Sequence, residues 1–260
     1  TAELVRRGAR HLLLIGRRAV SELGDEARAF LGRHADDGVR AVYRGGGCDT
    51  AKALADACTA LAGMPPVRGV VHAAGTLTRT PAAGLTADGY AAELRGKAAG
   101  AWWLHRASAG WPLDFFVLVS SVSALWGTEG CAAYSAANGM LDALAAHRTS
   151  LGLPAASLGF GPWALTGAGS GGMADGELLE RSARLGVGSF DAATGRAALT
   201  TTAPGPEGHL VVCPLDLERL RTVMSGLRPR GVFGGEPAPA ARAPREPSAA
   251  ARLLALPEDV

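Results

Sequence analysis

The sequence has little of three features that define whole classes of protein: paired cysteines, long apolar runs and an excess of one charge. Its cysteines stand far apart and form no CxxC pair, which excludes a zinc cluster or a disulfide framework: Cys48, Cys58, Cys131 and Cys213. A reducing, cytoplasmic setting is therefore expected, with no metal site. No apolar run reaches the ~18 residues of a membrane span, and Leu12–Ile15 is too short for a signal peptide.

Net charge and aromatic content are also low. The 26 Lys and Arg residues against 24 Asp and Glu leave a net charge of +2, which argues against nucleic acid or a membrane as the main partner. What the chain does have is 260 residues, of which 48% are hydrophobic and 36 are glycine. That size and composition predict one large globular domain.

Short apolar runs alternate along the chain with longer alanine-rich patterns. The expected strands are 11–15, 67–72, 115–120, 155–160 and 210–212, and the expected helices are 23–34, 50–61, 86–108 and 133–149. Because the strand runs are nearly all apolar rather than alternating, both faces of the sheet are expected to be buried, as in a doubly wound parallel α/β sheet. Such sheets bind ligands at the carboxyl ends of their strands.

The two ends of the chain differ from its middle. The sequence predicts a domain over residues 1–230 and a Pro/Ala-rich linker over residues 231–260, where a new helix is expected at 250–256. Residues 1–8 are typical of the end of a helix with Gly8 as its C-cap. Both ends are those expected of a piece of a longer polypeptide.

One group of polar residues has the spacing of a catalytic set. Ser121 ends a buried strand, Tyr134 lies thirteen residues later at a helix start, and Asn138 is one turn further on. Lys97 lies on the preceding long helix. A ketone that receives a hydride needs a proton donor, and a phenol of pKa about 10 needs a nearby ammonium to lower that value. A second hydroxyl would stabilise the charge on the ketone oxygen.

These residues resemble the catalytic set of short-chain dehydrogenases/reductases, and more closely that of the ketoreductase domains of modular type I polyketide synthases. The resemblance covers residues 1–220 and rests on an ordered series of segments: 8–14, 48–49, 71–75, 116–121, 133–138, 161–163 and 215–217. It implies a Rossmann-like fold with Tyr134 as the acid and Ser121 as the oxyanion partner. It also implies that Lys97 tunes Tyr134 and contacts the cofactor ribose, and that Asn138 holds a proton relay.

The same resemblance indicates how a cofactor would bind. After the second Rossmann strand the chain has Arg17 and Arg18 instead of a carboxylate, which favours the 2′-phosphate of NADPH, although Arg18 could equally be a solvated loop charge. Asp49 matches an adenine contact or, alternatively, the N-cap of the next helix. The remaining expected cofactor contacts are Ala73, Ala74, Gly75, Gly161, Pro162 and Trp163.

One element of the family is not found in the sequence. The first strand and its glycine-rich turn, which hold the pyrophosphate, have no counterpart in residues 1–10, and Gly45–Gly47 follows a later segment. In a sheet of order 3-2-1-4-5-6 that strand is central. Residues 1–260 alone are therefore expected to be poorly soluble and to bind NADPH weakly.

The implied reaction is reduction of a β-ketoacyl thioester to a β-hydroxyacyl thioester. The acyl chain would be held on the phosphopantetheine of an acyl carrier protein, beside other domains of the same synthase. The segment Leu77–Arg79 lacks a Leu-Asp-Asp motif and Trp126 lies eight residues before Tyr134, which indicates an A-type enzyme with an L-hydroxy product. Cys131, three residues before Tyr134, leaves epimerisation open.

Each of these residues also has a simpler interpretation. Tyr134 alone could pack in the core, Lys97 could be a solvated helix residue, and Trp126 and Cys131 could be wall or core residues. For the whole chain the alternatives are a non-reducing structural domain of a synthase and a free-standing short-chain reductase.

Overall fold

The computed structural model describes residues 1–33, 38–164, 176–202 and 208–227. The chain divides into two compact units, Thr1–Leu220 and Arg221–Val260. Of the second unit only residues 221–227 are described, as the end of helix α10. The predicted linker over 231–260 and its helix at 250–256 lie outside the described residues, and the boundary at residue 230 stays a prediction.

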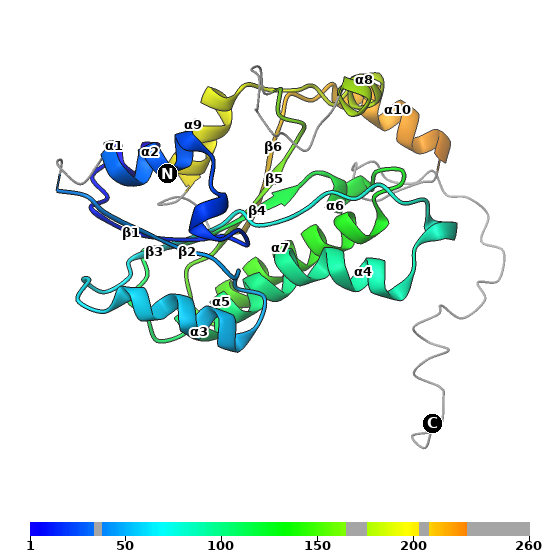
Figure 1. Cartoon of the computed structure of the whole chain (residues 1–260). Helices are drawn as coiled ribbons and strands as arrows, with labels where there is room; N and C mark the ends of the chain where they lie inside the picture. Colours follow the sequence, from blue (N-terminus) through cyan, green and yellow to red (C-terminus); the bar gives the residue numbers. More distant parts are fainter. Residues whose placement is uncertain (34–37, 165–175, 203–207, 228–260) are drawn as a thin grey trace. The chain divides into compact units, whose positions relative to one another are not determined.

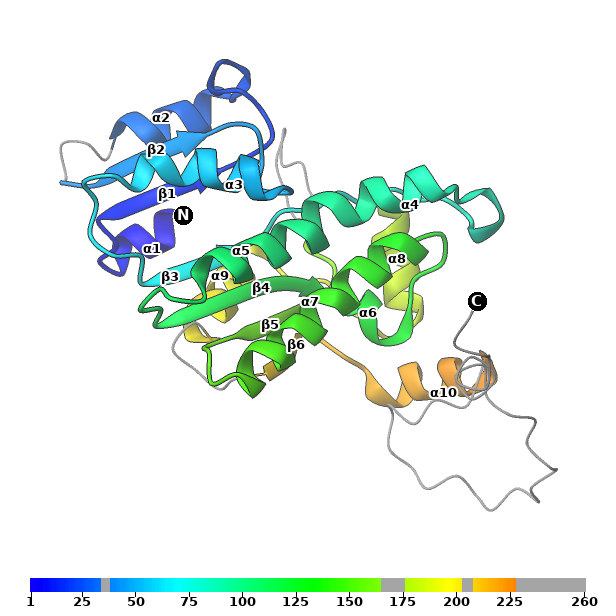
Figure 2. The same ribbon diagram turned by 90° about the horizontal axis from the view of Figure 1, so that it is seen from below.

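All strands of the first unit run parallel (Figures 1 and 2). One sheet has the order β3-β4-β5-β6, with bounds Gly69–His72, Phe115–Ser121, Ala156–Phe160 and Gly208–Val212. A second sheet pairs β1 (His11–Ile15) with β2 (Arg40–Arg44). The architecture is the predicted parallel α/β fold, although the described strands form two sheets rather than one.

Strand β2 was not expected from the sequence. The strand has an arginine at each end, Arg40 and Arg44, and three half-buried residues between them. It therefore has no apolar run long enough to predict a strand. The strand forms because it pairs in register with β1, where Leu13 lies opposite Val42. In the described part of the chain, β1 and β3 each hydrogen-bond to a strand on one side only.

The helices connect these strands in the expected alternation. Their bounds are α1 Ala2–Arg6, α2 Asp25–Arg33, α3 Ala51–Cys58, α4 Ala87–Leu94, α5 Gly100–Ser108, α6 Ser123–Trp126, α7 Ala132–Ser150, α8 Gly176–Arg184, α9 Ala192–Thr202 and α10 Leu217–Leu227. The single helix expected over 86–108 is divided by a π-helical turn, Arg95–Ala99. No helix in the described ranges has both the length and the apolar character needed to cross a bilayer.

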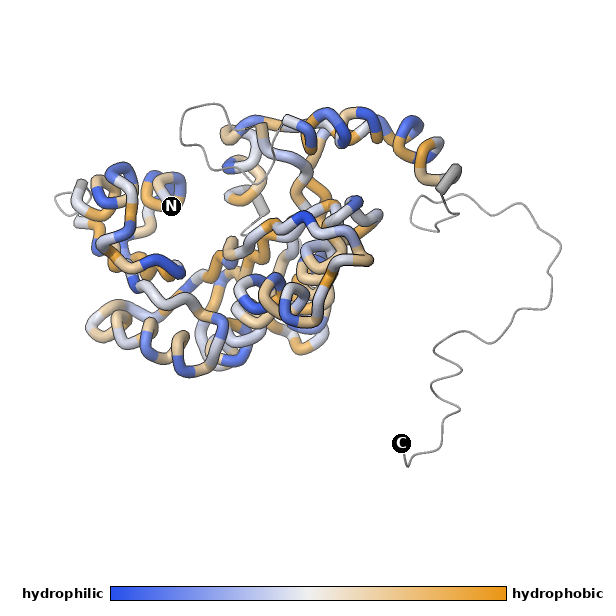
Figure 3. Tube along the Cα trace, turned by 45° about the vertical axis from the view of Figure 1, so that its right-hand side comes forward, coloured by the Kyte–Doolittle hydropathy of each residue, from blue (hydrophilic) through white to orange (hydrophobic). Residues whose placement is uncertain are grey.

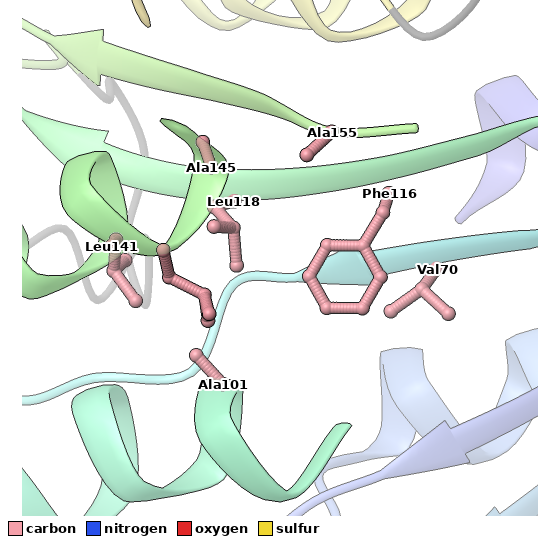
Figure 4. Packing of buried hydrophobic residues seen from close by; sticks show 8 residues of the cluster. Val70, Ala101, Phe116, Leu118, Leu141, Ala145 and Ala155 are labelled. Atoms are coloured by element: carbon pink, nitrogen blue, oxygen red, sulfur yellow. The ribbon is translucent and has the colours of Figure 1, made fainter. Parts of the chain in front are cut away.

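The main core lies where α5 and α7 cover one face of the larger sheet (Figure 2). Phe116 and Leu118 of β4 and Leu141 of α7 are fully buried there, and the small Ala101 and Ala145 allow the helices to approach the strands (Figure 4). On the other face, side chains of β4 and β5 meet α9 residues. Burial on both faces explains why these strands are mostly apolar. Figure 3 shows the hydropathy of each residue along the whole chain.

Candidate active site

The four predicted catalytic residues lie together at the carboxyl end of β4. Ser121 is the last residue of β4, and Tyr134 and Asn138 lie in the first two turns of α7. Lys97 reaches them from the π-helical turn: its Nζ donates to the Val119 carbonyl at 2.8 Å and lies 5.7 Å from the centre of the Tyr134 ring. Lys97 is 2% exposed, so its interpretation as a solvated helix residue is wrong.

The last residue of β3 and the segment after it hold Lys97 in place. His72 Nε2 donates to the Lys97 carbonyl at 2.8 Å, and burial lowers the pKa of His72 to about 4, so the imidazole is neutral at pH 7. A Cβ on Gly75 would stand only 2.7 Å from Lys97 Cε. Glycine is needed at position 75 because the lysine stem occupies that space.

Burial and charge act in opposite directions on Lys97. Burial lowers the pKa of its ammonium to about 8, while the carboxylates of Asp142 and Glu93 raise it. The pKa therefore lies close to neutrality, where a proton can be both held and released.

Tyr134 departs from the expectation of a lowered pKa. Burial raises the pKa of its phenol above the usual value, and hydrogen bonding from the Ser121 and Asn138 side chains only partly offsets this. The Lys97 Nζ, 5.7 Å from the centre of the Tyr134 ring, donates to the Val119 carbonyl.

Asn138 is fixed from both sides and has one unused acceptor. Its side-chain Nδ2 donates to the main-chain carbonyl of Tyr134 at 2.7 Å. The main-chain carbonyl of Asn138 accepts from Ser120 Oγ at 3.3 Å. Ser120 thus makes a structural contact. In the described part of the chain, Asn138 Oδ1 is buried without a hydrogen-bond partner, a position suited to an ordered water.

The predicted cofactor residues on the smaller sheet surround an open hollow. Arg17 and Arg18, both exposed, follow β1 and line it together with Gly16, Glu22 and Tyr43. The Tyr43 hydroxyl donates to the Arg18 carbonyl at 2.8 Å, which fixes the backbone there.

Asp49 does not cap the helix that follows it. The N-cap of α3 is Thr50, whose hydroxyl accepts from the Ala53 N–H at 3.1 Å. The alternative role of Asp49 as N-cap is therefore wrong, and its half-buried carboxylate lies outside the cap.

The other predicted cofactor contacts divide between open and packed positions. Ala73 and Ala74 are exposed after β3. Gly161 is buried, and a Cβ there would stand 2.4 Å from Cys213 Cβ; Pro162 follows it, half-buried. The Trp163 indole packs on Phe160 and Phe190, with ring centroids 5.1 Å away in each case, and its contact with the cofactor stays a prediction.

Two of the three predicted stereocontrol residues, Trp126 and Cys131, are buried. Trp126, at the end of α6, is 6% exposed, and Cys131, just before α7, is 1% exposed. Leu77 is half-buried between Thr76 and Thr78. The wall or core interpretation of Trp126 and Cys131 fits this burial.

Sequence reasoning did not single out Glu93, a buried carboxylate beside the site. Its oxygens accept from the Thr78 N–H at 3.3 Å and from the Thr76 hydroxyl at 3.4 Å. The available signal was its position four residues before Lys97. Within the described ranges, no group of three or more His, Cys, Asp or Glu side chains could hold a metal ion.

A parallel α/β domain with Ser121, Tyr134, Lys97 and Asn138 gathered at the end of β4 defines the class: a short-chain dehydrogenase/reductase fold. The model of the KR domain family matches residues 1–165. The chain therefore belongs to the KR family; it is a polyketide synthase ketoreductase domain.

Known proteins agree with that assignment. Polyketide synthase GfsB of Streptomyces halstedii is 39% identical over 233 residues, which are 87% of this chain and 4% of GfsB. The chain thus spans a small part of that relative. The structure of A-type ketoreductases from a modular polyketide synthase has a TM-score of 0.77 and 33% identity, over 88% of this chain and 47% of that one. PlmKR1, from phoslactomycin biosynthesis in Streptomyces sp. HK803, has a TM-score of 0.76 and 30% identity, over 91% and 56%.

Proposed function

We propose that this domain uses NADPH to reduce a β-ketoacyl thioester to the β-hydroxyacyl thioester. The observation that carries the proposal is the buried Lys97 ammonium, 5.7 Å from the ring centre of a phenol that also hydrogen-bonds with Ser121. A phenol flanked by a hydroxyl and an ammonium is suited to give a proton to a ketone oxygen.

Each of the four residues has its own part in delivering a proton to the ketone oxygen. Ser121 Oγ accepts the Ser123 N–H at 3.2 Å and hydrogen-bonds with the Tyr134 phenol; when substrate binds, its proton turns to the ketone oxygen. Tyr134 donates its phenolic proton to that oxygen, and Lys97 stabilises the phenolate left behind. Asn138 Oδ1 orders a water through which the phenolate regains a proton. When bound, the nicotinamide supplies the hydride that reduces the ketone carbon.

The chain's residues fit such a cofactor. Arg17 and Arg18 border an open hollow at the carboxyl end of β1, where a 2′-phosphate would meet guanidinium groups. Ala73 and Ala74 leave exposed backbone at the end of β3. Both sites lie at carboxyl ends of parallel strands, where such sheets bind nucleotides.

Arg17→Ala should weaken NADPH binding about tenfold, equal to about 1.4 kcal/mol, and leave NADH binding nearly unchanged. The physical reason is loss of the guanidinium that binds the 2′-phosphate, which NADH lacks. Fluorescence titration with both cofactors measures this, and Arg18→Ala is the matched control, with a smaller expected effect. Equal losses for both cofactors in Arg17→Ala would show that Arg17 does not meet the phosphate.

The proposed substrate is carried on the phosphopantetheine arm of an acyl carrier protein, and the other domains of the same synthase are the remaining partners. Support comes from the relatives, which are synthases many times longer than this chain. A thioester on a mobile arm can reach a site at the end of β4 without a pocket that encloses the whole acyl chain.

The product is proposed to be the L-hydroxy isomer, as in A-type ketoreductases. Trp126 stands eight residues before Tyr134, and Leu77–Arg79 lacks the Leu-Asp-Asp motif. The test is incubation with NADPH and a β-ketoacyl thioester, followed by chiral chromatography. An L-hydroxy product is expected; a D-hydroxy product would refute the A-type assignment.

One observation favours a second candidate, a non-reducing domain that organises a synthase. In the described residues the sheet is divided between β1 and β3, next to the proposed cofactor site. A folded protein that binds no NADPH would favour this candidate.

A further inference from the structure

Helix α7 carries a third polar side chain, Asp142, on the same face as Tyr134 and Asn138. Tyr134, Asn138 and Asp142 are each four residues apart, which places them on one face of the helix. Asp142 Oδ1 accepts from Ser157 Oγ at 2.6 Å, and His209 Nε2 lies 3.6 Å from the same oxygen. The reduction chemistry described above makes no use of this carboxylate.

The larger sheet fixes that arrangement. Ser157 of β5 and His209 of β6 lie opposite each other in the parallel register, so both side chains point to the face that α7 covers. A Cβ on Gly159 would stand 2.7 Å from His209 Nε2, so glycine leaves room for the imidazole. Ser157 is fully buried, and the Asp142 side chain is 17% exposed. A carboxylate in such surroundings is costly unless a positive charge compensates it.

His209, the nearer group, compensates that charge only if protonated, whereas Lys97 carries an ammonium whose pKa Asp142 raises. Its ammonium is almost fully buried, and its hydrogen bond to the Val119 carbonyl brings no compensating negative charge. Val119 lies opposite Leu158 in the β4–β5 register, and Leu158 is the neighbour of Ser157, which binds Asp142. The ammonium is thus bound to β4, the carboxylate is bound to the neighbouring strand β5, and helix α7, which carries the carboxylate, packs against both β4 and the π-helical turn of Lys97.

The other titratable groups around Lys97 supply less negative charge to its ammonium than Asp142 does. His72 of β3 is neutral, because burial lowers its pKa to about 4, and burial keeps the Tyr134 phenol of α7 protonated by raising its pKa. Glu93 of α4 is negative, but its field raises the pKa of Lys97 less than the field of Asp142 does.

We propose that Asp142 is a positioning residue for reduction: its carboxylate, fixed by Ser157, is the negative charge that holds the Lys97 ammonium in its buried place beside Tyr134. The effect of Asp142 on catalysis rests on the proposed function. The arrangement of charges itself does not require cofactor or substrate.

The sequence offers an unusually clean test, because its only lysines are Lys52 and Lys97. Protein labelled with ¹³C at lysine Cε, with a lysine-free upstream strand if solubility requires one, gives two NMR signals that are followed against pH. Lys97 is expected to titrate near 8. Asp142→Asn should lower its midpoint by roughly one pH unit, and Asp142→Glu, which keeps the charge, should restore most of it.

Asp56→Asn is the matched control, because Asp56 pairs with Lys52 at 2.5 Å on α3. It should leave the Lys97 midpoint unchanged. An unchanged Lys97 midpoint in folded Asp142→Asn would overturn the proposal. If that variant does not fold, Asp142→Ser, whose hydroxyl can still bind Ser157, replaces it with the same expectation.

Activity provides the second measurement. The pH above which reduction declines should fall in Asp142→Asn together with the Lys97 midpoint, and kcat should change more than KM, whereas a merely structural defect would leave the profile in place. A shifted Lys97 signal in a protein that reduces nothing would refute the proposed function and leave the role of Asp142 standing.

Discussion

Tyr134→Phe should lower the rate of β-ketoacyl reduction by about 100-fold or more, because the ketone oxygen loses its proton donor. The phenol hydrogen-bonds with Ser121, and its ring centre lies 5.7 Å from Lys97 Nζ. NADPH binding should remain nearly intact, since the variant keeps the ring and its packing. Steady-state assays and a cofactor titration on the same preparations measure both effects.

Tyr90→Phe is the matched control, because Tyr90 lies on α4 and is 38% exposed. It should reduce substrate at the wild-type rate. Full turnover by a folded Tyr134→Phe variant would show that the proton comes from another group, and the assignment of the catalytic set would be wrong.

The second large effect concerns the open edges of β1 and β3. In the described residues, His11–Ile15 pairs only with β2 and Gly69–His72 only with β4. Each buried backbone group without a partner costs about 1–3 kcal/mol, and a few of them equal the ~5–15 kcal/mol stability of a typical domain. Residues 1–260 alone are therefore expected to be poorly soluble and to bind NADPH weakly.

An added upstream strand and glycine-rich turn of roughly 15–25 residues should restore both properties. Denaturant unfolding and NADPH titration of the two forms measure the gain, and an extension of the same composition in scrambled order is the control. If residues 1–260 alone are monodisperse, unfold cooperatively and bind NADPH with micromolar affinity, the inferred strand order is wrong.

The elements that could be predicted from the sequence are those whose own residues carry the signal. The apolar runs of β4 and β5 and the alanine-rich α7 stand close to their expected bounds. The β2 strand, with arginines at both ends, has no such run and depends on pairing with β1. The π-helical turn within 86–108 breaks the regular hydrogen-bond pattern without a proline, and Gly96 within it does not by itself predict such a turn.

In the site, spacing along the chain predicted which residues meet, and tertiary burial decided their charges. Ser121, Tyr134 and Asn138 come together as their spacing indicates. The raised pKa of Tyr134, the buried Glu93 and the contact between Asp142 and Ser157 depend on packing between separate elements. No local sequence pattern encodes how deeply such groups are buried.

The most direct test of the proposed reduction follows the hydride and the proton in one experiment. NADPH carrying deuterium at the nicotinamide C4 position is mixed with the domain, extended by the upstream strand, and a β-ketoacyl thioester on an acyl carrier protein. The acyl chain is then analysed by mass spectrometry. The wild-type protein should place deuterium on the β-carbon of a hydroxyacyl product, and Tyr134→Phe should form very little of it. A wild-type protein that binds NADPH yet leaves the ketone unreduced would contradict the proposed function.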